Sequence, residues 1–202
     1  RVPAENVLAP EGGAGFLLAM KTFGRTRPII GSFAVGAARS ALDFSIHYAN
    51  KRRAFGKKLS EFQSIQFKLA EMYQKVETSR LLTYKAAWEA DQGMDPTISA
   101  SITKFYSTEK AMEVANDALQ IFGGYGYTKM MPIEKLLRDI RVFTIYEGTS
   151  EVQRIVVSRH VLNGYETVMP PLDDLPRYVA DDPEKAAKEI ETRGFIYSSS
   201  HI

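Results

Sequence analysis

Long stretches in which apolar and small residues recur every three or four positions dominate this sequence. The clearest runs from about Phe62 to Asp91 and carries such residues at positions 65, 69, 72, 76, 79, 83 and 86. This spacing places them on one face of an α-helix, and the stretch is far longer than an ordinary β-strand. Gly93 follows the stretch and is expected to end the helix. The sequence therefore predicts a long helix with one face against a core.

Two other stretches are also typical of long helices. Residues 14–50 are predicted to form one helix, which Pro28 should bend or interrupt, because proline lacks the N–H donor and clashes with the preceding turn. Another helix is expected to begin with Asp95 and Pro96 as N-cap and first-turn residues and to end at about Phe122. Its predicted core-facing residues lie at positions 102, 105, 112, 115, 119 and 122. The following "GGYGYT" is not expected to be helical.

Two shorter helices are predicted in the remaining part of this region. One follows Pro132, with apolar residues at positions 133, 136, 137 and 140. The last is capped by Thr149 or Ser150 and runs to about Leu162, with an apolar side at positions 152, 155, 156 and 162. Strand alternation is nearly absent, so the protein is expected to be all-α.

The order of these segments predicts the domain organisation. Long helices joined by short loops bury their apolar faces by packing nearly antiparallel, so residues 14–163 are predicted to form an antiparallel four-helix bundle. Residues 1–13, rich in Pro and Gly, are expected to be an extended segment before the bundle. Residues 164–202 are expected to be a C-terminal extension, or tail, with one short helix capped by Asp182 and Pro183.

Composition excludes several classes of function. The net charge is only +2, and basic residues cluster only at positions 51–53, so a nucleic-acid partner is not expected. The absence of cysteine excludes disulfides, thiolate catalysis and cysteine-based zinc sites. No uninterrupted apolar run approaches the roughly 18–20 residues of a membrane span, so none is expected. A carboxylate-bridged di-iron bundle needs Glu-x-x-His pairs, and no histidine here has a glutamate three positions before it.

Three segments carry residues suited to chemistry. Glu147 in "VFTIYEGTS" lies between apolar residues and a glycine, where a partly desolvated carboxylate would accept a proton well, although a glutamate beside a helix start is more often there for the helix dipole. Arg52 and Phe55 in "KRRAFGKKL" could bind a phosphate and a flat ring, or could offset a helix C-terminus. The glycines of "QIFGGYGYT" could expose backbone N–H groups to an anion, or simply form a C-cap.

Together these segments resemble the C-terminal domain of the acyl-CoA dehydrogenases, a family of flavoproteins. The resemblance lies in "KRRAFGKKLSEFQSIQFKLAEM", "ALQIFGGYGYTKMMPIEKLLRD" and "IYEGTSEVQR", in this order and spacing, and covers roughly residues 1–163. The medium- and short-chain branch is the most similar. The resemblance implies α,β-dehydrogenation of an acyl-CoA to a trans-2-enoyl-CoA, as in fatty-acid β-oxidation, with Glu147 as the catalytic base and FAD as the hydride acceptor.

The resemblance also implies roles for other residues. Some branches place the base instead on the first long helix, at the position of Thr26 or its neighbours, and "FGRTRP" has no acid there, which leaves Glu147. Two positions depart from the family pattern: Ala54 stands where a hydroxyl residue often contacts the cofactor, and Gly24 replaces an acid seen near the CoA in some relatives. The implied substrate-binding residues are Arg27, Tyr146 and Gly148, and the implied FAD-binding residues are Arg52, Phe55, Gln120, Gly123, Gly124, Thr149 and Glu151. No metal ligand is implied.

The partners that the resemblance implies are an acyl-CoA substrate and an electron-transfer flavoprotein. A homotetramer built as a dimer of dimers is expected, or a heteromer that supplies the N-terminal helical domain and the β-domain of the family, so this chain alone is expected to be incomplete. Acyl-CoA oxidase activity and a non-catalytic assembly scaffold are the alternatives. The implied location is the bacterial cytoplasm or the mitochondrial matrix.

Overall fold

A computed structural model of the protein describes residues 1–8, 13–165 and 188. The chain divides into two compact units, Arg1–Asn163 and Gly164–Ile202. The predicted short helix at Asp182 and Pro183 lies outside the described residues. All elements below belong to the first unit.

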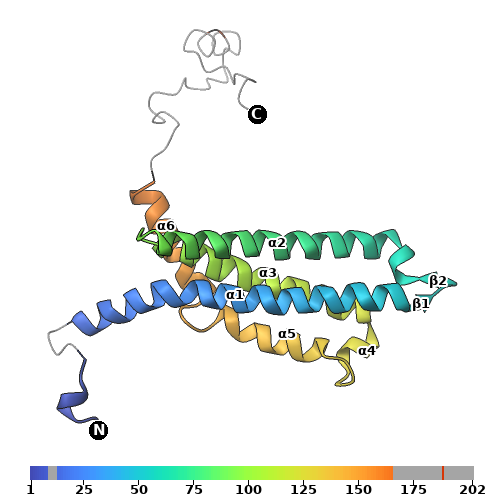
Figure 1. The fold of residues 1–202 in the computed structure, drawn as a ribbon, viewed down its shortest axis with the longest axis horizontal. Coiled ribbons are helices and arrows are strands. Elements are labelled where there is room, and N and C mark those ends of the chain that lie inside the picture. Colours follow the sequence, from blue (N-terminus) through green and yellow to red (C-terminus); the bar gives the residue numbers. More distant parts are fainter. Residues whose placement is uncertain (9–12, 166–187, 189–202) are drawn as a thin grey trace, which may run out of the picture. The chain divides into compact units, whose positions relative to one another are not determined.

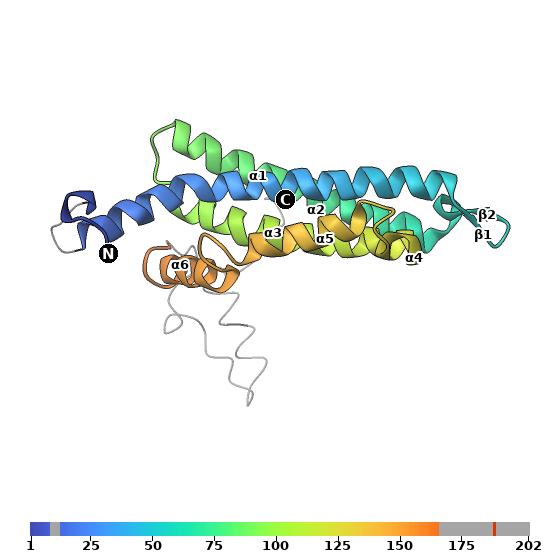
Figure 2. The same ribbon diagram turned by 90° about the horizontal axis from the view of Figure 1, so that it is seen from below.

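Four helices lie side by side along a common direction in both views of the ribbon (Figures 1 and 2). They are α1 (Ala14–Lys51), α2 (Gln63–Asp91), α3 (Thr97–Phe122) and α5 (Ile133–Arg141). α3 packs against α1, α2 and α5, and also against α6 (Ser150–Asn163). Successive long helices run antiparallel, so the prediction of an all-α, antiparallel four-helix bundle is confirmed. The described residues also contain three 3-10 turns, η1 (Ala4–Asn6), η2 (Leu59–Glu61) and η3 (Val142–Thr144).

Small apolar side chains build the core of the bundle, which allows the long helices to approach one another closely. The predicted inner face of α2 is confirmed, because positions 72, 76, 79, 83 and 86 are buried and positions 65 and 69 pack against the core edge. The predicted faces at positions 133, 136, 137 and 140 of α5 are confirmed in the same way. The buried core residues of the long helices include Ala34, Ala38, Ala41, Leu42, Met72, Val76, Ala111, Val114, Ala115 and Ala118.

The predicted inner face of α3 is wrong in its N-terminal half. Ile102 and Phe105 are only half-buried, whereas Thr103, Lys104 and Thr108 are buried. α3 is central and contacts helices on several sides, so its buried surface is wider than one apolar stripe. Polar side chains are tolerated there when they are hydrogen-bonded, as when the Thr108 hydroxyl donates to the backbone carbonyl of Lys104 at 2.8 Å.

The predicted apolar side of α6 is largely wrong. Val152, Ile155 and Leu162 are exposed and Val156 is half-buried, whereas the buried residues of this helix are Ser150 and Gln153. α6 therefore packs polar residues against α3. One of them, Gln153, supports the loop of the candidate site described below.

α1 continues through Pro28 as one helix and bends in its N-terminal part (Figure 2), in agreement with the prediction of one long, bent helix. Two other predictions need correction. Pro96, not Asp95, occupies the cap position of α3, while the Asp95 carboxylate accepts the N–H of Thr97 at 3.0 Å. The segment "GGYGYT" contains the one-turn helix α4 (Gly124–Tyr127), which forms because Gly126 lacks a Cβ atom that would lie 2.6 Å from the Cβ of Phe122.

A short hairpin follows α1. Strands β1 (Arg53–Ala54) and β2 (Lys57–Lys58) pair antiparallel, with Arg53 opposite Lys58. The two turn residues, Phe55 and Gly56, both have positive φ, at 51° and 82°. Two left-handed residues in a two-residue loop are typical of a type I′ hairpin turn.

α1 is also long and apolar enough, by length and composition, to cross a membrane, with an 18-residue window of mean hydropathy 1.3. This corrects the expectation that no segment of the chain approaches that length. The same helix contributes Ala34, Ala38, Ala41 and Leu42 to the centre of the bundle, so we describe it as a core helix.

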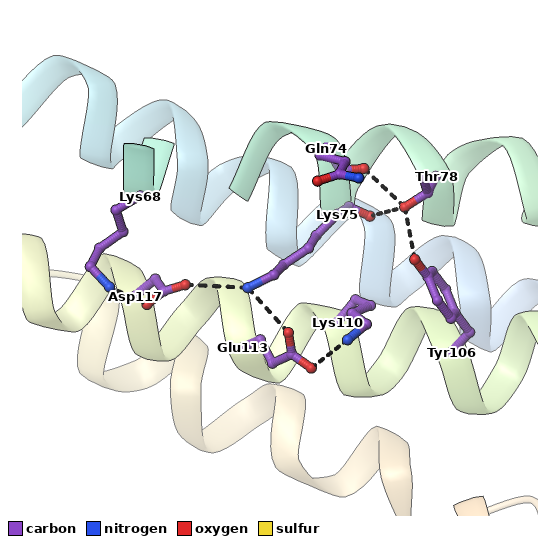
Figure 3. Close-up of polar contacts among 8 residues, drawn as sticks. All are labelled: Lys68, Gln74, Lys75, Thr78, Tyr106, Lys110, Glu113 and Asp117. Atoms are coloured by element: carbon purple, nitrogen blue, oxygen red, sulfur yellow. Dashed lines mark hydrogen bonds and ion pairs between the residues drawn. The ribbon is translucent and has the colours of Figure 1, made fainter. Parts of the chain in front are cut away.

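A polar network joins α2 to α3 along one side of the core (Figure 3). Asp117 accepts from Lys68 at 2.6 Å and from Lys75 at 3.5 Å, and Lys75 also pairs with Glu113 at 3.1 Å. Partly buried charges must be paired to be tolerated, so these contacts favour one register between the two helices.

Candidate active site

The loop between η3 and α6 carries the candidate base. Glu147 has φ +54° and Gly148 has φ +89°, so both are left-handed. This conformation costs a residue with a side chain roughly 1–2 kcal/mol, and it persists where neighbouring contacts hold it. The loop ends at Thr149, whose hydroxyl accepts the N–H of Val152 at 3.3 Å and so caps α6.

The carboxylate of Glu147 is half-buried and is held by α1. The Thr26 hydroxyl donates to its Oε2 at 2.7 Å. Thr26 also lines a surface cavity of about 660 Å³ between α1 and the segment that joins α2 to α3. The acid is therefore held by a residue that lines this cavity, although Glu147 is not itself among the lining residues.

Arg27 is buried next to the same loop, with only 6% of its surface exposed. Desolvation lowers its pKa, and the negative charge of Glu147 opposes that shift. Its Nε has no hydrogen-bond partner among the described residues. A Cβ atom added to Gly148 would lie 3.8 Å from an Arg27 Nη atom, which places the guanidinium against the loop backbone.

Two buried side chains that the sequence analysis did not select also contact this loop. Lys104 of α3 donates to the carbonyl oxygen of Gly148 at 2.8 Å, and Gln153 of α6 donates to the same oxygen at 3.1 Å. Both residues have 0% exposure. The sequence held a signal for Lys104, because it shares a helical face with the buried residues at positions 108, 111, 115 and 118. A lysine on a buried face is rarely there without a specific contact.

The burial of Lys104 predicts a pH dependence of stability. Desolvation, followed by the positive charge of Arg27, lowers the pKa of Lys104 to about 8, while Glu147, Glu151 and Glu109 act in the opposite direction. In the unfolded chain a lysine titrates near 10.4. Between about pH 8 and 10.4 the unfolded chain binds the extra proton, so the contribution of this group to the free energy of unfolding rises with pH.

Relative to a Lys104→Met variant, the wild-type protein should therefore gain stability as the pH rises from about 7.5 to about 9.5. Urea unfolding at several pH values, followed by circular dichroism, measures the difference between the two proteins. A difference that stays flat or falls over this range would contradict the burial of a charged lysine at this position.

The other residues near the loop occupy different environments. Tyr146 is half-buried and stacks on Phe143 at a ring distance of 5.9 Å, and desolvation, with the charge of Glu147, raises its pKa. Glu151 is exposed in the first turn of α6, where hydrogen bonds from its own backbone N–H and from the Thr149 hydroxyl lower its pKa. Thr149 and Glu151 line a second cavity of about 470 Å³. Arg27, Tyr146, Gly148, Thr149 and Glu151 are thus all brought together around Glu147.

The remaining predicted cofactor residues form a second group, the hairpin cluster, consisting of Arg52, Phe55, Gln120, Gly123 and Gly124. The hairpin and α4 lie at the opposite end of the bundle from α6 (Figure 1). Arg52, Gly123 and Gly124 line a cavity of about 520 Å³, and Gln120 is exposed beside it. Phe55 is 95% exposed at the tip of the hairpin.

The composition of the hairpin cluster fits a ligand with a pyrophosphate and a flat ring. Arg52 supplies a guanidinium fork, which lies 5.6 Å from the ring of Tyr125. A Cβ atom at Gly123 or Gly124 would meet nothing within 4 Å, so a ligand can approach the backbone there. Arg27 lies in α1 and Arg52 caps the C-terminus of that helix 25 positions later, or roughly 37 Å away at 1.5 Å per residue. A single chain therefore does not join the two groups into one site.

Comparison with known proteins gives the family. The family profile described as "Acyl-CoA dehydrogenase, C-terminal domain" matches residues 13–162. The chain belongs to the acyl-CoA dehydrogenase family. This is a family of flavin-dependent oxidoreductases. A probable acyl-CoA dehydrogenase, FadE25, of Mycobacterium leprae is 46% identical over 164 residues, which cover 80% of this chain and 42% of the relative.

Solved structures agree with the sequence comparison. Butyryl-CoA dehydrogenase from Megasphaera elsdenii matches with a TM-score of 0.76 and 44% identity, over 80% of this chain and 42% of that chain. A chain in a structure described as "Electron transferring flavoprotein of Acidaminococcus fermentans: Towards a mechanism of flavin-based electron bifurcation" matches with a TM-score of 0.76 and 42% identity, with the same coverage. This acyl-CoA dehydrogenase domain thus spans about two fifths of the length of its relatives.

Proposed function

We propose that this chain supplies the base-bearing part of an FAD-dependent acyl-CoA dehydrogenase. In this proposal Glu147 removes the α-proton of an acyl-CoA thioester, and the product is a trans-2-enoyl-CoA. The observation that carries the proposal is the Glu147 carboxylate, half-buried, held at 2.7 Å by Thr26 and flanked by the buried cations Arg27 and Lys104. A carboxylate held in place beside a cavity can meet a weakly acidic C–H with little reorganisation.

The surrounding residues would act on the charge that develops during proton transfer. As the α-proton moves to Glu147, negative charge grows on the thioester oxygen, and the backbone N–H of Glu147 is proposed to donate to that oxygen. The buried guanidinium of Arg27 supplies positive charge close to the loop. Tyr146 and Gly148 would line the acyl end of the substrate. FAD, when bound, would supply the two-electron oxidant that takes the β-hydrogen as hydride.

Each complete site is proposed to use two copies of the chain. The hairpin cluster and Glu147 lie at different ends of one bundle, and Phe55 is almost fully exposed, so the hairpin is placed to reach a cofactor held by a neighbour. Arg52 would bind the pyrophosphate, and Gln120, Gly123 and Gly124 the adenosine half. A homotetramer arranged as a dimer of dimers, or a heteromer that adds the other domains, satisfies this requirement.

An electron-transfer flavoprotein is the proposed electron acceptor. A chain with this fold occurs in the structure described as an electron transferring flavoprotein of Acidaminococcus fermentans, which supports that choice.

Anaerobic titration tests the proposed function directly. The FAD-loaded assembly that contains this chain is mixed with acyl-CoAs of increasing chain length, and the oxidised-flavin absorbance is followed. Loss of absorbance with at least one acyl-CoA, and rapid recovery on addition of an electron-transfer flavoprotein, is the expected result. No loss with any acyl-CoA would leave the scaffold alternative, and rapid recovery in air alone would indicate an acyl-CoA oxidase.

A further inference from the structure

Two buried donors from two helices meet at one backbone oxygen next to the proposed base. Lys104 Nζ, from α3, and Gln153 Nε2, from α6, lie 2.8 Å and 3.1 Å from the carbonyl oxygen of Gly148. Gln153 Nε2 also lies 3.4 Å from the carbonyl oxygen of Glu147. We refer to Lys104 and Gln153 together as the carbonyl clamp. It ties the loop that carries Glu147 to both helices.

The chemistry of the clamp leaves little freedom in how it is arranged. The opposite orientation of the Gln153 amide would place its oxygen against two carbonyl oxygens, so only the amide nitrogen suits this position. Gly148 must also lack a side chain, because a Cβ atom there would lie 2.5 Å from Gln153 Nε2. The glycine, the glutamine and the lysine therefore depend on one another.

A role in packing alone explains Lys104 poorly. Its ammonium is fully buried, with Arg27 as a nearby like charge, and the ion pairs among the described residues do not include it. An apolar side chain of similar volume would fill this space without the cost of desolvating a charge. The hydrogen bond that the lysine makes is to the loop carbonyl.

The loop itself needs such contacts. Glu147 is a residue with a side chain at φ +54°, and a conformation of this kind is kept only where surrounding groups fix it. Thr26 holds the carboxylate end of Glu147, and Thr149 caps the helix that follows. The backbone between these two contacts is held by the carbonyl clamp.

We propose that Lys104 and Gln153 are positioning residues that fix the left-handed backbone of Glu147 and Gly148, and thereby aim the Glu147 carboxylate toward Thr26 and the adjoining cavity. This inference rests on the proposed function for its catalytic meaning, but its structural part can be measured separately. Among the described residues, the hydrogen bonds that define the clamp go to the loop carbonyls of Glu147 and Gly148, so the clamp is proposed to act through the loop.

The structural part is tested on the chain itself by amide hydrogen exchange. In a Lys104→Met variant the amides of residues 146–153 should exchange at least about ten times faster than in wild type, since opening of the loop no longer breaks that hydrogen bond. The matched control is Lys110→Met, a lysine on the same helix that pairs with Glu113 at its surface. Exchange in α2 should stay unchanged in both variants. Gln153→Met repeats the test with one donor removed and carries it alone if Lys104→Met loses helix content.

The catalytic part is tested in the FAD-loaded assembly. Lys104→Met and Gln153→Met should each slow flavin bleaching and kcat by about tenfold or more, with a smaller change in KM, because both the base and the Glu147 N–H that meets the developing charge are displaced. Lys110→Met should behave as wild type.

Three outcomes distinguish the proposed function from the inference about the carbonyl clamp. If Glu147→Gln abolishes bleaching but both clamp variants match Lys110→Met in loop exchange and in rate, the clamp inference is wrong and the proposed function stands. If wild type does not bleach with any acyl-CoA, the function fails, and loop exchange alone decides whether the clamp holds the loop. If loop exchange rises but kcat does not fall, the clamp is structural and its positioning role is overturned.

Discussion

Replacing Glu147 with glutamine is expected to abolish the bleaching of bound flavin by acyl-CoA. Positioned proton transfer contributes roughly 10²- to 10⁴-fold to a rate, and an amide does not accept the α-proton. The substitution keeps the shape of the side chain, and the amide oxygen can still accept the hydrogen bond that Thr26 now donates to the carboxylate at 2.7 Å. The loss should therefore reflect proton transfer rather than a change in the loop.

Stopped-flow mixing of the FAD-loaded assembly with acyl-CoA under anaerobic conditions measures this effect. Flavin content should be unchanged, because Glu147 is not among the proposed FAD-binding residues. Glu71→Gln, on the exposed face of α2, serves as the matched control and should bleach at the wild-type rate. Bleaching that persists in Glu147→Gln would remove this residue as the base and reopen the search around Thr26.

Replacing either of two glycines of α1 with alanine should change the free energy of unfolding, but in opposite directions. Gly31 is buried, and a Cβ atom there would lie 2.5 Å from Thr103 Cγ2 and 3.2 Å from Thr83 Oγ1, so both neighbouring helices would have to shift. Overpacking of this kind costs about 1–3 kcal/mol, so Gly31→Ala should lower the free energy of unfolding. Gly36 is exposed and meets nothing within 4 Å, so Gly36→Ala should raise it by about 0.5–1 kcal/mol through helix propensity.

Thermal unfolding followed by circular dichroism separates these two variants. For a chain of this size each kcal/mol corresponds to a change of roughly 2–4 °C in Tm, so Gly31→Ala should unfold below wild type and Gly36→Ala above it. A stabilised Gly31→Ala would show that α1 and α3 are not packed as closely as the position of Thr103 requires.

The helices could be predicted where a single apolar face decides burial. The inner face of α2, with Met72 and Val76, follows from a spacing of three or four residues, because that helix packs on the core from one side. α3 could not be predicted in the same way. It is surrounded by other helices, so Lys104 and Thr108 are buried through hydrogen bonds rather than through hydrophobicity.

The candidate site could be predicted only in part. Glu147 and the hairpin cluster were selected because their motifs resemble those of the family. Their catalytic and cofactor-binding roles stay predictions. Lys104 and Gln153 were missed because each contacts a backbone carbonyl, and a carbonyl carries no signature in the sequence. The buried face of α6 was predicted wrongly from its apolar residues. Gln153 is buried because it contacts the preceding loop, and the periodicity of the helix carries no information about that contact.

The sequence by itself determined the helices, the bundle and the family, because each of these follows from local periodicity or from motifs read along the chain. Only the tertiary structure decided that Thr26 touches Glu147, that two buried donors hold the Gly148 carbonyl, and that the hairpin cluster lies far from the acid. These facts depend on how α1, α3 and α6 pack together, and contacts between residues distant in sequence leave no periodic pattern in it.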